Sequence, residues 1–77
     1  MKILIVEDDM TLAKELVLLC ERWGFDAVYA KQFDDITNEY ISRQPDLILM
    51  DINLPSFDGF YWCEKIRQIS NVPLLYL

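Results

Sequence analysis

Residues 47–51 read Leu-Ile-Leu-Met-Asp, an uninterrupted apolar run that ends in a carboxylate. Residues 3–9 repeat the arrangement, because Ile-Leu-Ile-Val is followed there by Glu-Asp-Asp. A continuous apolar run of this length is typical of a strand buried on both faces of a parallel sheet. The two runs therefore predict two central strands of one sheet, each with acids at its carboxyl end.

The remainder of the chain alternates between strand and helix patterns. Further strands are predicted at 25–29 and 72–77, and helices at 10–23, at 33–43 and from Gly59 onward. This alternation indicates repeated strand-helix-strand units, and hence an α/β domain with a parallel sheet. Asp26 interrupts the strand at 25–29, so we expect this strand at an edge. No linker, repeat or second domain is visible within residues 1–77.

Helical periodicity predicts which side chains face the core. The expected inward residues are Leu12, Leu16, Leu19, Cys20 and Trp23 in the first helix, Phe33, Ile36, Tyr40 and Ile41 in the second, and Phe60, Cys63, Ile66 and Ile69 in the third. We expect Asp9 to cap the first helix and Gly24 to end it. Pro45 should end the second helix, because its ring disfavours helical geometry at Gln44.

The composition indicates an acidic folded protein. The chain is 53% hydrophobic and 26% charged, with a net charge of -6 that opposes binding to nucleic-acid phosphates or to anionic lipid. The run at 3–6 is too short for a signal peptide or a membrane span. Cys20 and Cys63 lie within apolar helical patterns, so we expect two reduced core cysteines in a cytoplasmic protein without a membrane partner.

The acids that follow the two central strands are the candidate site. If the strands are neighbours, Glu7, Asp8 and Asp9 converge with Asp51 at the sheet edge where parallel sheets bind ligands. Like charges at short range repel unless a cation neutralises them, and Mg²⁺ prefers carboxylate and carbonyl oxygens. A carboxylate beside such a cation can attack phosphorus and form an aspartyl phosphate. The same acids could instead cap a helix and begin a turn, and their spacing alone leaves both interpretations open.

Three stretches resemble the receiver domain of two-component response regulators. They are residues 2–9 (Lys-Ile-Leu-Ile-Val-Glu-Asp-Asp), residues 45–55 (Pro-Asp-Leu-Ile-Leu-Met-Asp-Ile-Asn-Leu-Pro) and Asp58-Gly59. The chain is most similar to the winged-helix branch that includes OmpR and PhoB. Residues 71–77 also resemble regulators of antimicrobial-peptide sensing in Gram-positive bacteria. The resemblance implies a flavodoxin/CheY-like doubly wound sheet with strand order 2-1-3-4-5.

The resemblance also implies roles for individual residues. Asp51 would be the phosphoacceptor, and Glu7 and Asp8 would bind Mg²⁺ with it, directly or through water. Asn53 would add its backbone carbonyl to the metal. A sensor histidine kinase would supply the phosphoryl group, and the domain would catalyse only its own phosphorylation rather than act as an enzyme. Its state would control transcription through a DNA-binding output domain outside these residues.

The loop after Asp51 receives structural roles from the same resemblance. Leu54 and Pro55 would shape it, Pro by restricting φ, and Gly59 would permit conformations barred to other residues. A calcium EF-hand is excluded, because the twelfth position counted from Asp51 is Trp62 and not Glu. Trp62 itself is expected to cover core or an interface and not to bind a ligand.

Two other classes of function fit these residues less well. A pseudo-receiver that acts without phosphate would not need the acids Glu7, Asp8 and Asp51. A phosphotransferase or phosphatase of the haloacid dehalogenase type would have a second Asp two residues after its nucleophile, where this chain has Asn53. The receiver interpretation is therefore preferred to both.

The C-terminal strand pattern, residues 72–77, has no turn or polar tail after it. Receivers have a Ser or Thr after the fourth strand and a Lys at the end of the fifth, and neither position falls within these residues. We therefore expect an N-terminal part of one receiver domain, without its last strand and last two helices, that does not switch conformation by itself. An exposed fourth strand invites pairing with another chain, so self-association through this edge is expected. The milder explanation is that the rest of the domain is merely omitted.

Overall fold

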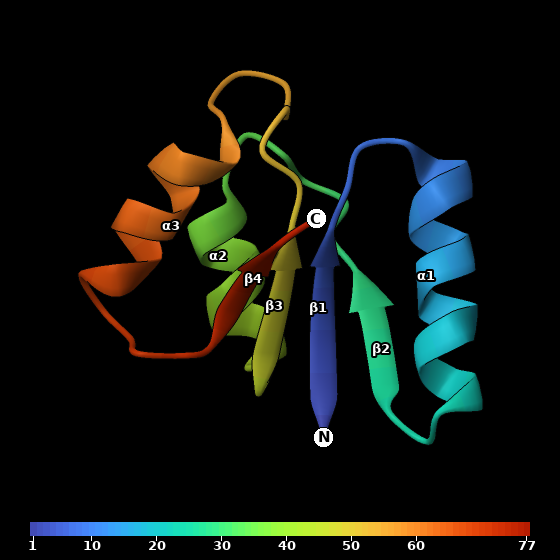
Figure 1. The fold of residues 1–77 in the computed structure, drawn as a ribbon. Helices are drawn as coiled ribbons and strands as arrows, with labels where there is room; N and C mark the ends of the chain where they lie inside the picture. Colours follow the sequence, from blue (N-terminus) through green and yellow to red (C-terminus); the bar gives the residue numbers. More distant parts are fainter.

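A computed structural model describes residues 1–77 as four parallel strands and three helices (Figure 1). The strands are β1 (Lys2–Val6), β2 (Asp26–Tyr29), β3 (Leu47–Met50) and β4 (Leu74–Tyr76), and the helices are α1 (Met10–Arg22), α2 (Ile36–Arg43) and α3 (Gly59–Arg67). The sheet order is β2-β1-β3-β4, and every pair is parallel. The predicted α/β class, the central positions of β1 and β3 and the edge position of β2 are confirmed.

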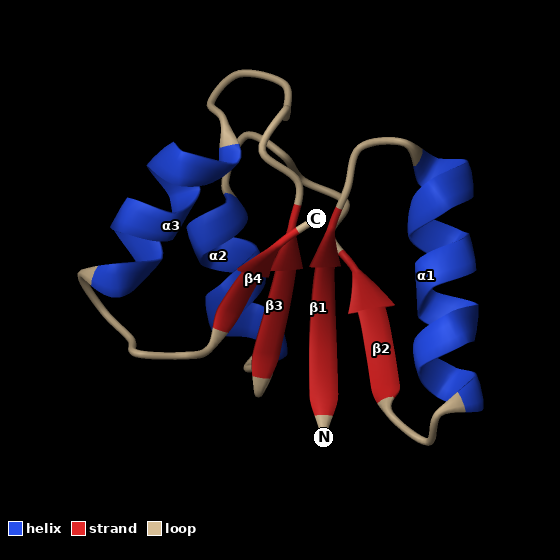
Figure 2. Ribbon diagram, viewed as in Figure 1, coloured by secondary structure: helices blue, strands red, loops and turns tan.

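The helices divide between the two faces of the sheet, as Figure 2 shows. Helices α2 and α3 cover a core of nine buried residues, whereas α1 covers a smaller core of three. Strand β1 supplies both cores, because its side chains alternate between the faces. Leu4 and Val6 belong to the larger core, and Ile3 and Ile5 to the smaller. None of the helices combines the length and the hydrophobicity that a membrane crossing requires.

The set of residues predicted to face inward from α1 is partly wrong. Leu12, Leu19 and Trp23 are exposed, and Trp23 keeps 76% of its surface in water. The helix packs on the sheet through fully buried Ala13, together with Met10, Leu16, Val17 and Cys20. Apolar residues occur around more than one face of α1, so periodicity could not identify the packed face. The small side chain of Ala13 lets the helix lie close to the strands.

The predicted faces of α2 and α3 need similar corrections. Ile41, Phe60 and Ile69 are each more than half exposed, whereas Trp62 keeps only 5% of its surface exposed. The interpretation of Trp62 as a core residue is therefore confirmed. Ile36 and Ile66 are buried as predicted, and Phe33 and Tyr40 pack against the larger core. Cys20 and Cys63 are free thiols that are half-buried, so neither is fully within the core.

Capping residues mark where the helices begin and end. The Asp9 carboxylate accepts hydrogen bonds from the N–H groups of Thr11 and Leu12, which confirms its capping role. Gly24 follows α1 with φ +88°, and Gln44 ends α2 with φ +49°. Helix α2 begins three residues later than predicted, because Asp35 caps it by accepting from the Asn38 N–H.

Candidate functional site

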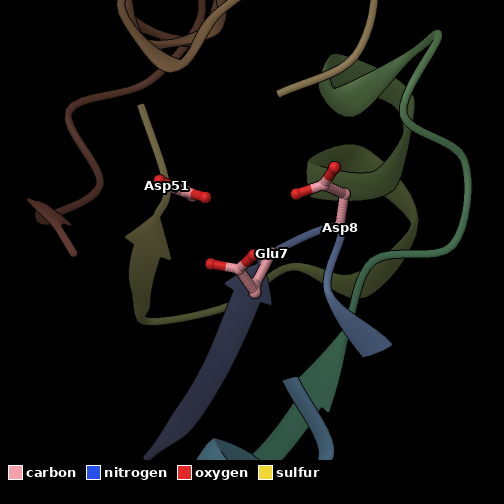
Figure 3. Close-up of side chains that lie close together, drawn as sticks. All are labelled: Glu7, Asp8 and Asp51. Atoms are coloured by element: carbon pink, nitrogen blue, oxygen red, sulfur yellow. The ribbon is translucent and has the colours of Figure 1, made fainter. Parts of the chain in front are cut away.

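Three of the four acids predicted to converge do so at the carboxyl ends of β1 and β3. Val6 pairs with Met50 in the sheet, so Glu7 and Asp51 leave neighbouring strands side by side. The Asp51 N–H donates to the Val6 carbonyl at 2.9 Å, which extends the pairing by one residue. Carboxylate oxygens of Glu7, Asp8 and Asp51 all lie within 4.8 Å of one another, and Figure 3 shows the three side chains facing a common space.

Glu7 is the buried member of this acidic cluster, with 5% of its surface exposed. Its Oε1 accepts a hydrogen bond from the Asp9 N–H at 3.1 Å, which holds the carboxylate in place. Burial raises the pKa of Glu7, and the neighbouring carboxylates of Asp51 and Asp8 raise it further. The cluster therefore favours any partner that brings positive charge, whether a proton or a cation.

Asp51 is the half-buried member, reachable from solvent but anchored through its backbone. Its Oδ1 accepts from the Asn53 N–H at 3.3 Å, so the following turn orients the carboxylate. Asp8 is exposed, and Asp9 turns away from the cluster to cap α1. The cluster thus consists of Glu7, Asp8 and Asp51, and Asp9, which was also predicted to converge there, is not part of it.

The loop from β3 to α3 contains backbone strain at a residue that the sequence did not single out. Ser56 has φ +68°, and the Phe57 N–H donates to the Pro55 carbonyl at 2.9 Å, which closes a γ-turn around Ser56. Phe57 then stacks on Tyr61 of α3 with ring centroids 4.1 Å apart. A serine gives no signal for this conformation, since it rarely adopts positive φ.

Gly59 was expected to permit a backbone conformation barred to other residues, and this expectation is wrong. Among the glycines only Gly24 has positive φ. Gly59 instead begins α3, is buried, and lies against the backbone of Asp51. Its N–H donates to the Ile52 carbonyl at 2.8 Å.

Comparison with known proteins identifies the family. Residues 3–77 match the sequence profile described as the response regulator receiver domain. The chain belongs to this receiver family. It is 47% identical over all 77 residues to the response regulator protein GraR of Staphylococcus haemolyticus, and 44% identical to GraR of Staphylococcus aureus. The chain covers 34% of the length of each of these relatives.

Solved receiver structures match the fold. The N-terminal domain of the nisin resistance regulator NsrR has a TM-score of 0.88 at 43% identity, with 97% of this chain and 63% of that chain covered. The BeF3-activated receiver domain of Klebsiella pneumoniae RstA has a TM-score of 0.92 at 29% identity, with 99% and 65% covered. The CheY-like receiver fold is therefore confirmed. Receiver domains generally bind Mg²⁺ in an acidic pocket, and the Glu7, Asp8 and Asp51 cluster is such an acidic group.

Proposed function

We propose that Asp51 accepts a phosphoryl group from a sensor histidine kinase in a reaction that depends on Mg²⁺. The observation that carries the proposal is the cluster of Glu7, Asp8 and Asp51 at the carboxyl ends of adjacent strands, with oxygens within 4.8 Å. Membership in the receiver family supports the assignment, because this family is a signalling domain of two-component systems. The chain would thus catalyse only its own modification.

The transfer is a displacement at phosphorus. A carboxylate oxygen of Asp51 attacks the phosphorus of a phosphohistidine, and a P–O bond forms as the P–N bond breaks. The imidazole nitrogen leaves with the bonding electron pair, and the product is an aspartyl phosphate. The Asn53 N–H keeps the Asp51 carboxylate oriented during the approach. Half-burial leaves that carboxylate accessible to a partner protein.

The residues of the cluster suit a hard divalent cation. Glu7, Asp8 and Asp51 would hold Mg²⁺ directly or through water, and the Asn53 backbone carbonyl would be a further ligand. The raised pKa of Glu7 supports this assignment, because it reflects first the burial of the carboxylate and then the neighbouring carboxylates, and a bound cation would offset both. When bound, Mg²⁺ neutralises the acidic cluster and the charge of the transferring phosphoryl group.

The proposal extends to the longer protein that the relatives suggest. The chain spans about a third of the length of its GraR relatives, so further domains are expected in the parent protein. We infer a cytoplasmic regulator in which phosphorylation of this receiver controls a DNA-binding output domain. The net charge of -6 supports placing DNA contacts outside these residues.

Intact-mass spectrometry tests the phosphoacceptor. The chain is incubated with acetyl phosphate and Mg²⁺, beside Asp51→Asn and a matched control, Asp34→Asn, which changes an exposed acid outside the cluster. We expect one phosphoryl adduct in the wild type and in Asp34→Asn, and none in Asp51→Asn or with EDTA. An adduct that persists in Asp51→Asn would refute the assignment. Absence of any adduct in the wild type would mean that the transfer requires the Ser or Thr and the Lys that receivers have outside these residues.

Self-association through β4 stays a prediction with a structural basis. Strand β4 is at the sheet edge, and Leu75 and Leu77 are 58% and 47% exposed. An unpaired apolar edge of this kind can add a strand from a second copy. Light scattering across a concentration series should show dimers that Leu75→Lys disperses, with Leu18→Lys on α1 as the control. A monomer at every concentration would contradict the prediction.

A further inference from the structure

Gly59 and Asp51 approach each other unusually closely through their backbones. A Cβ built on Gly59 would overlap with the Asp51 carbonyl oxygen. The same Cβ would lie 3.1 Å from the Asp51 carbonyl carbon and 3.1 Å from the Ile52 Cα. These neighbours are backbone atoms, which cannot rotate aside as the end of a flexible side chain can. Any side chain at position 59 therefore requires the two segments to separate.

Local backbone preference does not explain this glycine. Gly59 is a helical residue without positive φ, and its N–H is bonded to the Ile52 carbonyl. Alanine is the better helix former at such a position, so helix propensity alone would favour replacing the glycine. The reason for glycine lies in the contact with Asp51.

Both sides of the contact are anchored. Helix α3 is capped by Asp58, which accepts from the Tyr61 N–H at 2.9 Å, and its Trp62 and Ile66 are buried in the larger core. On the other side, the Asp51 N–H is bonded to the Val6 carbonyl at the end of β1. The backbone of Asp51 is thus held between the last residue of β1 and the first residue of α3.

We propose that Gly59 is a positioning residue for Asp51: its bare Cα lets α3 start directly against the Asp51 backbone and so sets the distance from Asp51 to Glu7 and Asp8. The inference rests on the proposed function, since it concerns the geometry of that acidic cluster. A methyl group at position 59 displaces Asp51 from its two partner acids, and the metal ligands then no longer meet at one point.

The test compares Gly59→Ala with Gly24→Ala in the 77-residue chain. Gly24 lies at the opposite end of the sheet with φ +88°, and a Cβ there would meet nothing within 4 Å. Gly24→Ala therefore strains the backbone without touching the site. Isothermal titration with MgCl₂ should show a Kd raised about tenfold to a hundredfold in Gly59→Ala and unchanged in Gly24→Ala. Phosphorylation by acetyl phosphate should slow in Gly59→Ala alone.

A second measurement does not depend on the metal. Hydrogen exchange of the Asp51 amide, followed by NMR without Mg²⁺, should accelerate in Gly59→Ala relative to the Leu4 amide of the core, and not in Gly24→Ala. If Gly59→Ala is unfolded in buffer, both measurements are made in trimethylamine oxide, which favours the compact state.

The outcomes separate the inference from the proposed function. Wild-type Mg²⁺ affinity and normal Asp51 exchange in Gly59→Ala would overturn the positioning role. Equal losses of Mg²⁺ affinity in Gly59→Ala and Gly24→Ala would also overturn it, because the cause would then be general destabilisation. If the wild type itself binds no Mg²⁺, the proposed function fails, and the exchange of the Asp51 amide still decides whether Gly59 positions it.

Discussion

Strands β1 and β3 each combine an apolar stretch with an acidic residue directly after it. The apolar stretches stabilise the fold, whereas the acidic residues destabilise it. Val6 and Met50 are completely buried in the larger core, and the next residue along each strand is Glu7 or Asp51. Within one residue the environment changes from packed side chains to crowded carboxylates. Burial of the apolar side chains stabilises the fold, whereas repulsion between the carboxylates destabilises it.

The difference shows where this fold tolerates unfavourable charge. The hydrogen bond from the Asp51 N–H to the Val6 carbonyl continues the sheet into the acidic cluster, so the acids are held by the strands beneath them. A site that must gather like charges requires a rigid support, which the core provides. Substitutions in the core and in the cluster should therefore have effects of opposite sign.

The largest expected effect is from Ile48→Ala in the larger core. Ile48 is fully buried, and its truncation should lower the free energy of unfolding by about 2–5 kcal/mol. A domain of this size rarely has more than about 3–5 kcal/mol in total, so a large fraction should be unfolded. Urea denaturation followed by circular dichroism measures the change. The matched control is Ile41→Ala, at a 52% exposed position, where the loss should stay within about 0.5 kcal/mol. Equal losses at both positions would contradict the described core.

The next effect has the opposite sign. Glu7→Gln removes the buried charge and keeps an oxygen that can accept the Asp9 N–H, so it should raise the free energy of unfolding by about 0.5–2 kcal/mol in EDTA. The exposed control Glu64→Gln should change little. Urea denaturation with and without Mg²⁺ is the measurement. A destabilised Glu7→Gln in EDTA would show that the cluster is not repulsive.

The same residue predicts a dependence on pH. The pKa of Glu7 is higher in the folded chain than its ordinary value of 4.5, so the folded state binds the proton more tightly than the unfolded state. The stabilisation that this tighter proton binding gives the folded state is complete below pH 4.5, and it is lost as the pH rises through the raised pKa of Glu7. Without Mg²⁺, the free energy of unfolding of the wild type, relative to that of Glu7→Gln, should therefore decline as the pH rises from 4.5 through the raised pKa of Glu7. A relative stability that rises with pH would contradict the sign.

The smallest expected effect concerns α1. Leu19 was predicted to face the core but is 49% exposed, so Leu19→Ala should change the free energy of unfolding by no more than about 0.5 kcal/mol. Leu16→Ala, at a half-buried position that packs on the smaller core, should lose more. Thermal unfolding of the two variants side by side makes the comparison. A larger loss of stability in Leu19→Ala than in Leu16→Ala would instead support the inward face of α1 that periodicity predicted.

Most of the strand pattern and of the acidic cluster could be predicted from sequence. Residues 47–50 form β3 as expected, and the acids after β1 and β3 meet because parallel strands present their carboxyl ends at one edge. The helical faces were less predictable. Helices such as α1 carry apolar residues on several faces, so burial of Ala13 in preference to Leu12 depends on how closely the helix lies to the sheet.

The order of residues alone specifies the alternation of strands and helices, the α/β class, the Asp9 cap of α1 and the identities of the acids that gather at one edge. These features follow from local patterns, since side-chain periodicity and capping act within a few residues. Packing between elements that are distant in the sequence decided instead that Ser56 takes the strained turn and that Gly59 is needed for space and not for φ. Each of these depends on how close two segments come, and that distance is set by packing across the whole domain.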